Sequence, residues 1–176
     1  MSYTGHISHR APGCRVFLRP IEASWDDAYR VTRWRNEASA RAGFFSQDVV
    51  TPDTHMEFMR RRKPHDLVWV LHDEAGESIG MLSLTVDVEA HTAEYGRLYI
   101  DKGYQGRGYA EDAEYTLLHF AFEVLRLDSL WLDALTTNTA VIALHHKTGW
   151  LDAGVDVPGN THPRGPTLQM TFGIAA

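Results

Sequence analysis

Three apolar runs separated by very short connections constrain the fold most strongly. Residues 67–73 (LVWVLHD), 78–89 (SIGMLSLTVDVE) and 93–100 (AEYGRLYI) are typical of strands, with only the turns AGE and AHT between them. Connections this short join antiparallel neighbours, because a parallel pair needs a crossover of roughly a dozen residues or more. The centre of the chain is therefore predicted to form a three-stranded antiparallel meander.

Helices and further strands flank this meander. Ser24, followed by Asp27, has a capping-box pattern, and Thr51 precedes Pro52 as a second helix start. Residues 42–50 are expected to form a loop. A strand–helix–strand crossover after the meander predicts a mixed α/β (α+β) fold, with a mixed, mostly antiparallel sheet and helices on its faces. The expected strands are 14–21, 129–135 and 167–174, with a further one near 150–157, and the expected helices are 24–36, 51–63, 111–125 and 139–149.

Length and composition favour one globular domain. The 176 residues are 44% hydrophobic and 23% charged, which suits a single domain over residues 14–176 after a flexible arm, residues 1–13. With 17 basic and 23 acidic residues, the net charge of −6 argues against nucleic acid as a partner. It weakly favours a cationic substrate.

The distribution of cysteine and apolar residues predicts a cytoplasmic protein. Cys14 is the single cysteine, so no disulfide can form within the chain. The first residues do not resemble a signal peptide, and no apolar stretch approaches the roughly 20 residues of a membrane span. No metal is expected, since the ten histidines form no His-x-His or His-x-x-x-His pair.

A glycine-rich turn, GYQGRGYA (103–110), joins the third meander strand to the helix after it. The unpaired N–H groups and partial positive charge of a helix start can bind phosphate when glycines let it approach. The simpler alternative is a turn that needs positive φ angles. The Gly-Lys-Ser/Thr ending of a nucleotide P-loop is absent, and the strands upstream form no βαβ unit.

The turn and a second motif together resemble the GCN5-related N-acetyltransferases (GNAT). Residues 105–110 (QGRGYA) fit the Gln/Arg-x-x-Gly-x-Gly/Ala signature that binds acyl-CoA in this family. Residues 144–150 (LHHKTGW) resemble a later family motif, Leu-Tyr-x-Lys-x-Gly-Phe, and the order of elements resembles the family fold over residues 14–174. The resemblance implies a sheet splayed between strands 93–100 and 129–135, with acetyl-CoA as cosubstrate in the splay.

Residue roles follow from the resemblance by position. The pyrophosphate of acetyl-CoA would accept hydrogen bonds from the backbone of Gln105, Gly106, Arg107, Gly108, Tyr109 and Ala110. The pantetheine arm would pair with Leu98, Tyr99 and Ile100. Asn138 matches an asparagine that contacts the cofactor arm, although helix N-capping alone would also explain it.

The chemistry, direct attack of an amine on a thioester, needs a base and an acid. Glu94 is the first candidate base, because a carboxylate at the edge of an apolar cleft can have a raised pKa. The alternatives for Glu94 are a solvated carboxylate at the strand edge or an ion pair with Arg97, and His72 and His91 are rival bases. His145 stands where the family commonly has a tyrosine acid, and is the candidate proton donor to the thiolate. Cofactor packing by His145 is the alternative, with Tyr99, Tyr109 or water as the donor.

The acceptor amine is expected against the first two helices. RWRN (33–36) and TPDTH (51–55) resemble the branch that acetylates nucleotide-linked amino sugars. Arg35 would bind a phosphate, and Asn36 and His55 would bind sugar hydroxyls; capping and packing around a helix hairpin is the alternative explanation of these residues. The opening FLRPIE (17–22) resembles the ribosomal-protein N-terminal branch, so a protein N-terminus is an alternative, as are antibiotic or amino-acid amines. A silent acyl-CoA-binding module is the non-enzyme alternative. A monomer or a homodimer is expected.

Overall fold

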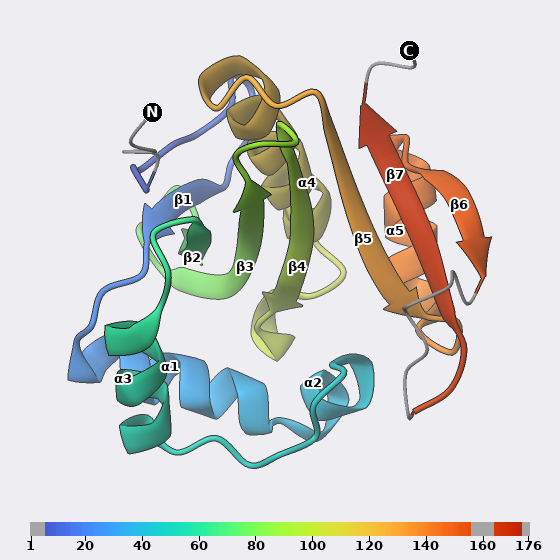
Figure 1. The fold of residues 1–176 in the computed structure, drawn as a ribbon. Coiled ribbons are helices and arrows are strands. Elements are labelled where there is room, and N and C mark those ends of the chain that lie inside the picture. The colour runs from blue at the N-terminus through green and yellow to red at the C-terminus, as the bar shows by residue number, and fades with distance from the viewer. Residues whose placement is uncertain (1–5, 156–163, 174–176) are drawn as a thin grey trace.

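The computed structural model describes residues 6–155 and 164–173 (Figure 1). The predicted order of elements is confirmed, including the additional strand. The strands are β1 (Phe17–Pro20), β2 (Asp66–His72), β3 (Ser78–Asp87), β4 (Thr92–Ile100), β5 (Ser129–Leu135), β6 (Leu151–Val155) and β7 (Thr167–Gly173). The helices are α1 (Trp25–Asn36), α2 (Ala38–Gly43), α3 (Pro52–Arg61), α4 (Tyr109–His119) and α5 (Thr139–Thr148), with a 3-10 turn at Lys102–Tyr104 and a π-helical turn at Phe120–Val124.

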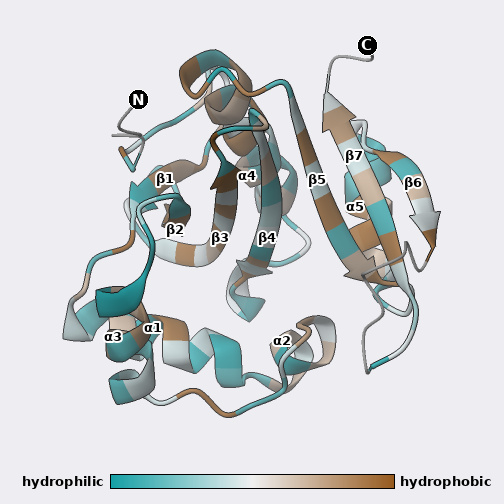
Figure 2. Cartoon of the chain, in the orientation of Figure 1, coloured by the Kyte–Doolittle hydropathy of each residue, from teal (hydrophilic) through white to brown (hydrophobic). Residues whose placement is uncertain are grey.

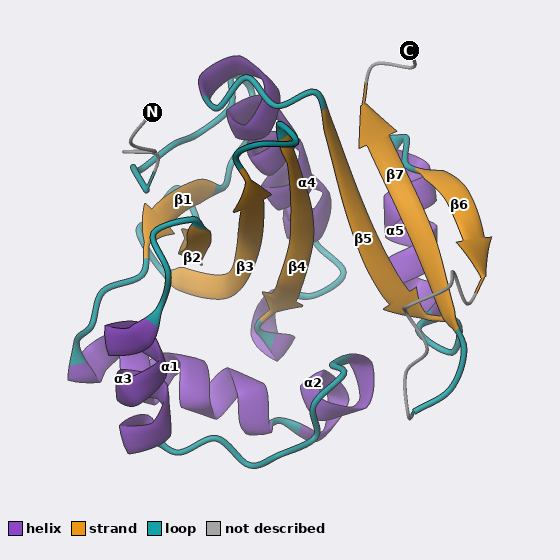
Figure 3. Ribbon diagram, viewed as in Figure 1, coloured by secondary structure: helices purple, strands orange, loops and turns teal. Residues whose placement is uncertain are grey.

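The strands form one sheet in the order β1-β2-β3-β4-β5-β7-β6. The meander prediction holds, because β2 pairs antiparallel with β3, and β3 with β4. The pairing of β4 with β5 is parallel and covers only Thr92↔Ser129, Ala93↔Leu130 and Glu94↔Trp131. Beyond Glu94 the two strands diverge, which confirms the predicted splay (Figure 3).

Alternation along β2 divides the core between the two faces of the sheet. Leu67, Trp69 and Leu71 belong to the cluster that α4 covers, whereas Val68 and Val70 pack with residues of α1 and α3. Figure 2 shows the apolar strands between these helical layers. The helices therefore lie on both faces, as predicted, and the open splay lies between the two halves of the sheet.

Local differences from the sequence prediction have physical causes. The short helix α2 was not predicted, and two of its residues lie in the stretch that was expected to be a loop. Ser24 caps α1 by accepting from the Asp27 N–H at 3.3 Å, as expected. The reciprocal half of the capping box is absent, because the Asp27 carboxylate accepts from Arg19 and from the Glu22 N–H. Within the predicted arm, His9 exchanges two backbone hydrogen bonds with Leu18.

Candidate active site

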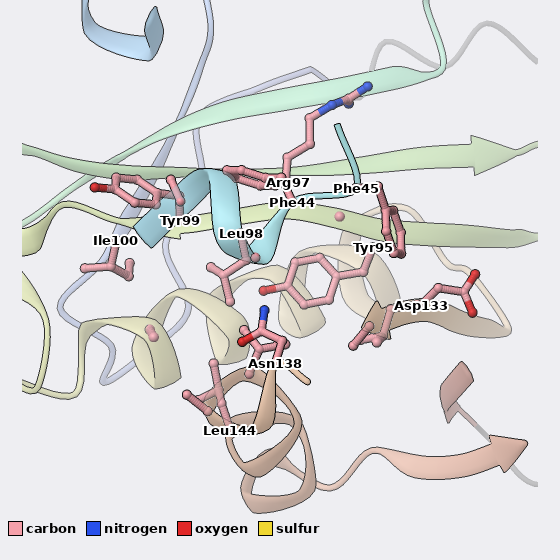
Figure 4. A pocket seen from close by; sticks show the side chains of 18 of the residues that line it. Phe44, Phe45, Tyr95, Arg97, Leu98, Tyr99, Ile100, Asp133, Asn138 and Leu144 are labelled. Carbon is pink, nitrogen blue, oxygen red and sulfur yellow. The ribbon is translucent and has the colours of Figure 1, made fainter. Parts of the chain in front are cut away.

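A pocket of about 770 Å³ occupies the splay, and we refer to it as the wedge pocket. Its walls are residues 94–100 of β4, residues 132–134 of β5, the first turns of α5, and α2 with the loop that follows it. Figure 4 shows side chains from β4, β5 and α5 extending into it, including Tyr95, Leu98 and Asn138. The predicted site residues that line it are Arg35, Glu94, Leu98, Tyr99, Ile100, Gln105, Ala110, Asn138 and His145.

The glycine turn presents unpaired backbone donors at the start of α4. Outside the bonds within helices and strands, no backbone carbonyl of the described residues accepts a hydrogen bond from the N–H groups of residues 106–110. Gly106 and Gly108 have φ angles of 72° and 81°, so the positive-φ explanation of these glycines is also correct. Anion binding by this turn stays a prediction, and the left-handed backbone at Gly108, the N-cap of α4, is compatible with it.

Arg15 supports this turn, a role that no sequence pattern predicted. Its Nε donates to Asp112 at 2.5 Å, and its Nη2 donates to the carbonyl of Arg107 at 3.0 Å. Its guanidinium also lies 4.7 Å from the ring centroid of Tyr109. Gln105 ties the other end of the turn, since its side chain donates to the Ile100 carbonyl at 2.8 Å. The turn is therefore held in place from both sides.

β4 carries a bulge inside the pocket. Met81 pairs with Tyr99 and Ser83 with Gly96, so β4 has one extra residue there, and Arg97 has a φ of 54°. Residues 95–100 have no ladder partner on the β5 side. The backbone at Leu98, Tyr99 and Ile100 therefore borders the pocket where an extended ligand arm could pair with it.

Asn138 begins α5 but its side chain makes no capping hydrogen bond. Its Nδ2 lies instead beside Gly43 of α2, where a Cβ built on the glycine would approach it to 3.0 Å. The capping alternative is therefore wrong for the side chain, and Asn138 projects into the pocket (Figure 4).

Glu94 is half-buried at the point where β4 and β5 separate. Burial raises the pKa of its carboxyl, Asp133 raises it further, and Arg97 lowers it. The alternative of an ion pair with Arg97 is wrong, because Arg97 pairs with Asp66. A carboxylate with a raised pKa beside a ligand pocket is suited to accept a proton.

His145 is buried and contacts a second buried residue that sequence reasoning missed. Its Nδ1 lies 2.8 Å from Oε1 of Glu114, a carboxylate with no exposed surface on α4. The signal available was a glutamate three residues before Leu117, on the apolar face of that helix. Tyr95 packs edge-on against His145, with ring centroids 5.6 Å apart.

The rival residues are less well placed. His72 contacts Arg19 and the Gly76 carbonyl, and His91 lies in an exposed turn; neither lines the pocket. Tyr99 lines the pocket, but its pKa is raised to about 12, chiefly because it is buried. Tyr109 does not line the pocket and packs against Arg15 and Tyr104.

Of the three residues predicted to bind the acceptor, only Arg35 lines the wedge pocket. Arg35 lines the pocket, and its guanidinium lies 4.1 Å from the ring centroid of Phe44. Asn36 instead exchanges two hydrogen bonds with the backbone of Val50, at 2.7 and 2.9 Å. His55 is buried against Phe58 outside the pocket lining, and burial lowers its pKa.

A comparison with protein families identifies the class of protein to which this fold and pocket belong. A family model described as "Acetyltransferase (GNAT) domain" matches residues 15–150, so the chain belongs to the GNAT acetyltransferase family. It is an acetyl-CoA-dependent N-acetyltransferase. Among curated proteins, none matches the chain.

Several solved structures share this fold. A spermidine N-acetyltransferase from Vibrio cholerae, described in complex with CoA and spermine, superposes with a TM-score of 0.79 at 19% identity, covering 90% of this chain and 95% of that one. A GCN5-related N-acetyltransferase from Brucella melitensis gives 0.77 at 15%, covering 96% and 79%. A ribosomal-protein-S5-alanine acetyltransferase from Vibrio fischeri gives 0.76 at 15%, covering 95% and 96%. At these identities the likeness concerns the fold.

The described residues offer neither a cluster of metal ligands nor a membrane-spanning helix. Within residues 6–155 and 164–173, no group of three or more His, Cys, Asp or Glu side chains is arranged to hold a metal ion. In the same ranges, no helix combines the length and the apolar character needed to cross a bilayer.

Proposed function

We propose that this chain acetylates the primary amine of a small molecule that also carries an anionic group, as in an amino sugar phosphate or a nucleotide-linked amino sugar. The observation that carries the proposal is Arg35. Its guanidinium lines the wedge pocket, and no carboxylate of the described residues lies within ion-pair distance of it. Burial, with a further contribution from Arg97, lowers its pKa, so an anion bound there would offset a desolvation cost.

The pocket offers different charges to the two ends of such an acceptor. Glu94 and Asp133 line it with carboxylates, which favour an amine, whereas Arg35 and Arg97 line it with guanidinium groups. A polyamine acceptor would bring further ammonium groups near the guanidinium of Arg35, whereas Arg97 is already paired with Asp66. The spermine bound by the Vibrio cholerae neighbour is therefore not the ligand class that we propose for this chain.

Within this pocket the chain's own residues would act at three points. The N–H groups of residues 105–110 would bind the pyrophosphate, and the unpaired edge of β4 would align the pantetheine arm. Glu94 would accept a proton from the incoming ammonium, and His145 would serve the departing thiolate. Holding both reactants in one pocket supplies a large part of the rate, with no covalent enzyme intermediate.

An acceptor panel tests the proposal. Release of CoA thiol is measured with glucosamine, glucosamine 6-phosphate, UDP-glucosamine, spermidine and an alanyl peptide. The two phosphate-bearing amino sugars should give the highest kcat/KM. Arg35→Gln should raise their KM by about 10- to 100-fold, the worth of a hydrogen bond to a charged group, and leave the KM for glucosamine unchanged.

The matched control is Arg60→Gln, which removes an exposed arginine of α3 that lies outside the pocket lining. It should behave as the parent with every acceptor. Preference for spermidine or for the peptide, or an equal effect of Arg35→Gln on glucosamine and its phosphate, would overturn the anionic-acceptor proposal.

A further inference from the structure

A buried carboxylate lies behind His145, outside the wedge pocket. Glu114 has no exposed surface, and its Oε1 lies 2.8 Å from Nδ1 of His145, which is 3% exposed. Its other oxygen, Oε2, has no hydrogen-bond partner within the described part of the chain. A carboxylate in an apolar core destabilises the fold unless a donor or cation compensates it, and His145 is the side chain that meets it.

The imidazole of His145 is held on several sides. Glu114 engages Nδ1, Tyr95 packs edge-on with ring centroids 5.6 Å apart, and Trp150 lies at the same centroid distance. Nε2 makes no hydrogen bond to any described residue, and His145 lines the pocket whereas Glu114 does not. Nε2 is therefore the ring nitrogen that remains available to a bound ligand.

We propose that Glu114 is a positioning residue for acetyl transfer: it keeps the proton of neutral His145 on Nδ1, so that Nε2 can exchange a proton with the reactants. A carboxylate that accepts from Nδ1 fixes the tautomer and also stabilises the imidazolium when Nε2 is protonated. The inference rests on the proposed N-acetyltransferase chemistry of the same pocket. It does not depend on which amine is the acceptor.

The proton transfers balance as follows. The acceptor enters as an ammonium ion and gives one proton to Glu94, which releases it to solvent. The amine nitrogen then bonds to the acyl carbon and gives a second proton to Nε2 of His145. The carbon–sulfur bond breaks, its electron pair leaves on sulfur, and the imidazolium returns its proton to the thiolate. The products are the amide and CoA thiol, with Glu114 and His145 in their starting states.

Two ionisable side chains face the His145 ring, and its two charged neighbours on α5 form ion pairs elsewhere. Glu114 faces it from α4 and Tyr95 faces it from β4. Its neighbours on α5, His146 and Lys147, form surface pairs with Asp152 at 2.7 Å and Glu111 at 2.5 Å. Glu114 is therefore the carboxylate that contacts the His145 ring directly.

Kinetics of Glu114→Gln and Glu114→Leu test the role, using whichever acceptor of the panel turns over fastest. Both variants should lower kcat at least about tenfold and leave the KM for acetyl-CoA within about twofold, because the residue acts through a proton donor and not on the cofactor. Melting curves establish that each variant folds, and the leucine variant removes the buried charge altogether.

Glu111→Gln is the matched control, because it removes another carboxylate that joins α4 to α5, at the surface. It should keep the parental kcat and pH profile. A double-mutant cycle tests whether Glu114 acts through His145. In the His145→Phe background, Glu114→Leu should cause no further loss of kcat. Additive losses, or unchanged kcat in both Glu114 variants, would overturn the positioning role.

Nitrogen-15 NMR of the His145 ring provides a readout that needs no acceptor. With the signal assigned by its absence in His145→Phe, the parent should show a protonated Nδ1, and Glu114→Gln should show a mixture of tautomers. A parent ring protonated on Nε2 would contradict the inference. If the anionic-acceptor proposal failed, the acceptor panel would reveal it while these NMR and double-mutant results stayed as expected.

Discussion

Arg97 forms its ion pair with Asp66 of β2, at 2.8 Å, and not with Glu94, three residues earlier on its own strand. Glu94 and Arg97 are three residues apart, so a regular strand would point their side chains to opposite faces of the sheet, and β4 has its bulge at Arg97, where φ is 54°. No described cation lies within ion-pair distance of Glu94. The Glu94 carboxyl, with its pKa raised chiefly by burial, is thus left to act on a bound amine.

Glu94→Gln should lower turnover at neutral pH by about 10²- to 10⁴-fold, the usual contribution of one positioned base. The amide keeps the size and hydrogen bonding of the carboxylate but cannot accept the proton. The deficit should shrink at high pH, where free amine becomes abundant. Steady-state kinetics between neutral and alkaline pH provide the measurement, and acetyl-CoA affinity should stay parental.

Glu89→Gln, in the exposed turn before β4, is the control and should have parental kinetics. A deficit in Glu94→Gln of equal size at every pH would show that Glu94 positions the substrate and does not take its proton.

The same substitution should stabilise the fold at neutral pH. Because the folded-state pKa of Glu94 is raised, ionisation is disfavoured in the folded protein, and stability is lost as pH rises through that pKa. Glutamine does not titrate and avoids this loss. Melting temperatures should therefore be higher for Glu94→Gln than for the parent near pH 7, and the difference should disappear below about pH 4, where the carboxyl is neutral in both states. A lower melting temperature at neutral pH would contradict the raised pKa.

Local patterns predicted the fold well because its elements depend on local chemistry. Short turns fixed the antiparallel meander, Thr51 with Pro52 marked the start of α3, and Gly149 ended α5 with a φ of 102°. The splay between β4 and β5 came from the family resemblance and not from periodicity. The helix α2 escaped prediction, because a six-residue helix has too little periodic pattern to register.

The site was predicted less completely, because its side chains are arranged by contacts between distant parts of the chain. Glu114 and His145 are 31 residues apart and meet only when α4 and α5 pack together. Arg97 is near Glu94 in the sequence, but its partner is Asp66 on β2, 31 residues earlier in the chain. Arg15, before β1, braces a turn 92 residues further along the chain.

Gly108→Val should abolish the stabilisation that acetyl-CoA gives the fold. A Cβ at Gly108 would lie 3.0 Å from Arg15 Nη2, and the φ of 81° is strained for any branched residue. The larger effect is on binding, because the side chain would obstruct the N–H groups that open toward the pyrophosphate. The measurement is the rise in melting temperature on adding acetyl-CoA, which the parent should show by mass action.

Gly76→Val separates backbone strain from loss of binding. Gly76, in the turn between β2 and β3, has a φ of 82° and open space around its Cβ position. Both valine variants should therefore melt lower by a similar amount without ligand, whereas only Gly108→Val should lose the acetyl-CoA shift. A normal shift in Gly108→Val would show that the turn is not the pyrophosphate site.

Asn138→Ala should weaken acetyl-CoA binding with little effect on stability. Asn138 occupies the N-cap position of α5 without making the capping hydrogen bond, so the helix loses nothing when the amide is removed. Thr51→Ala is the matched comparison, because Thr51 accepts from the Thr54 N–H at the start of α3 and its loss should cost about 1 kcal/mol. Denaturant unfolding and acetyl-CoA titration of the two variants should therefore give opposite patterns. If Asn138→Ala lost as much stability as Thr51→Ala and kept the parental acetyl-CoA affinity, the role of Asn138 would be structural.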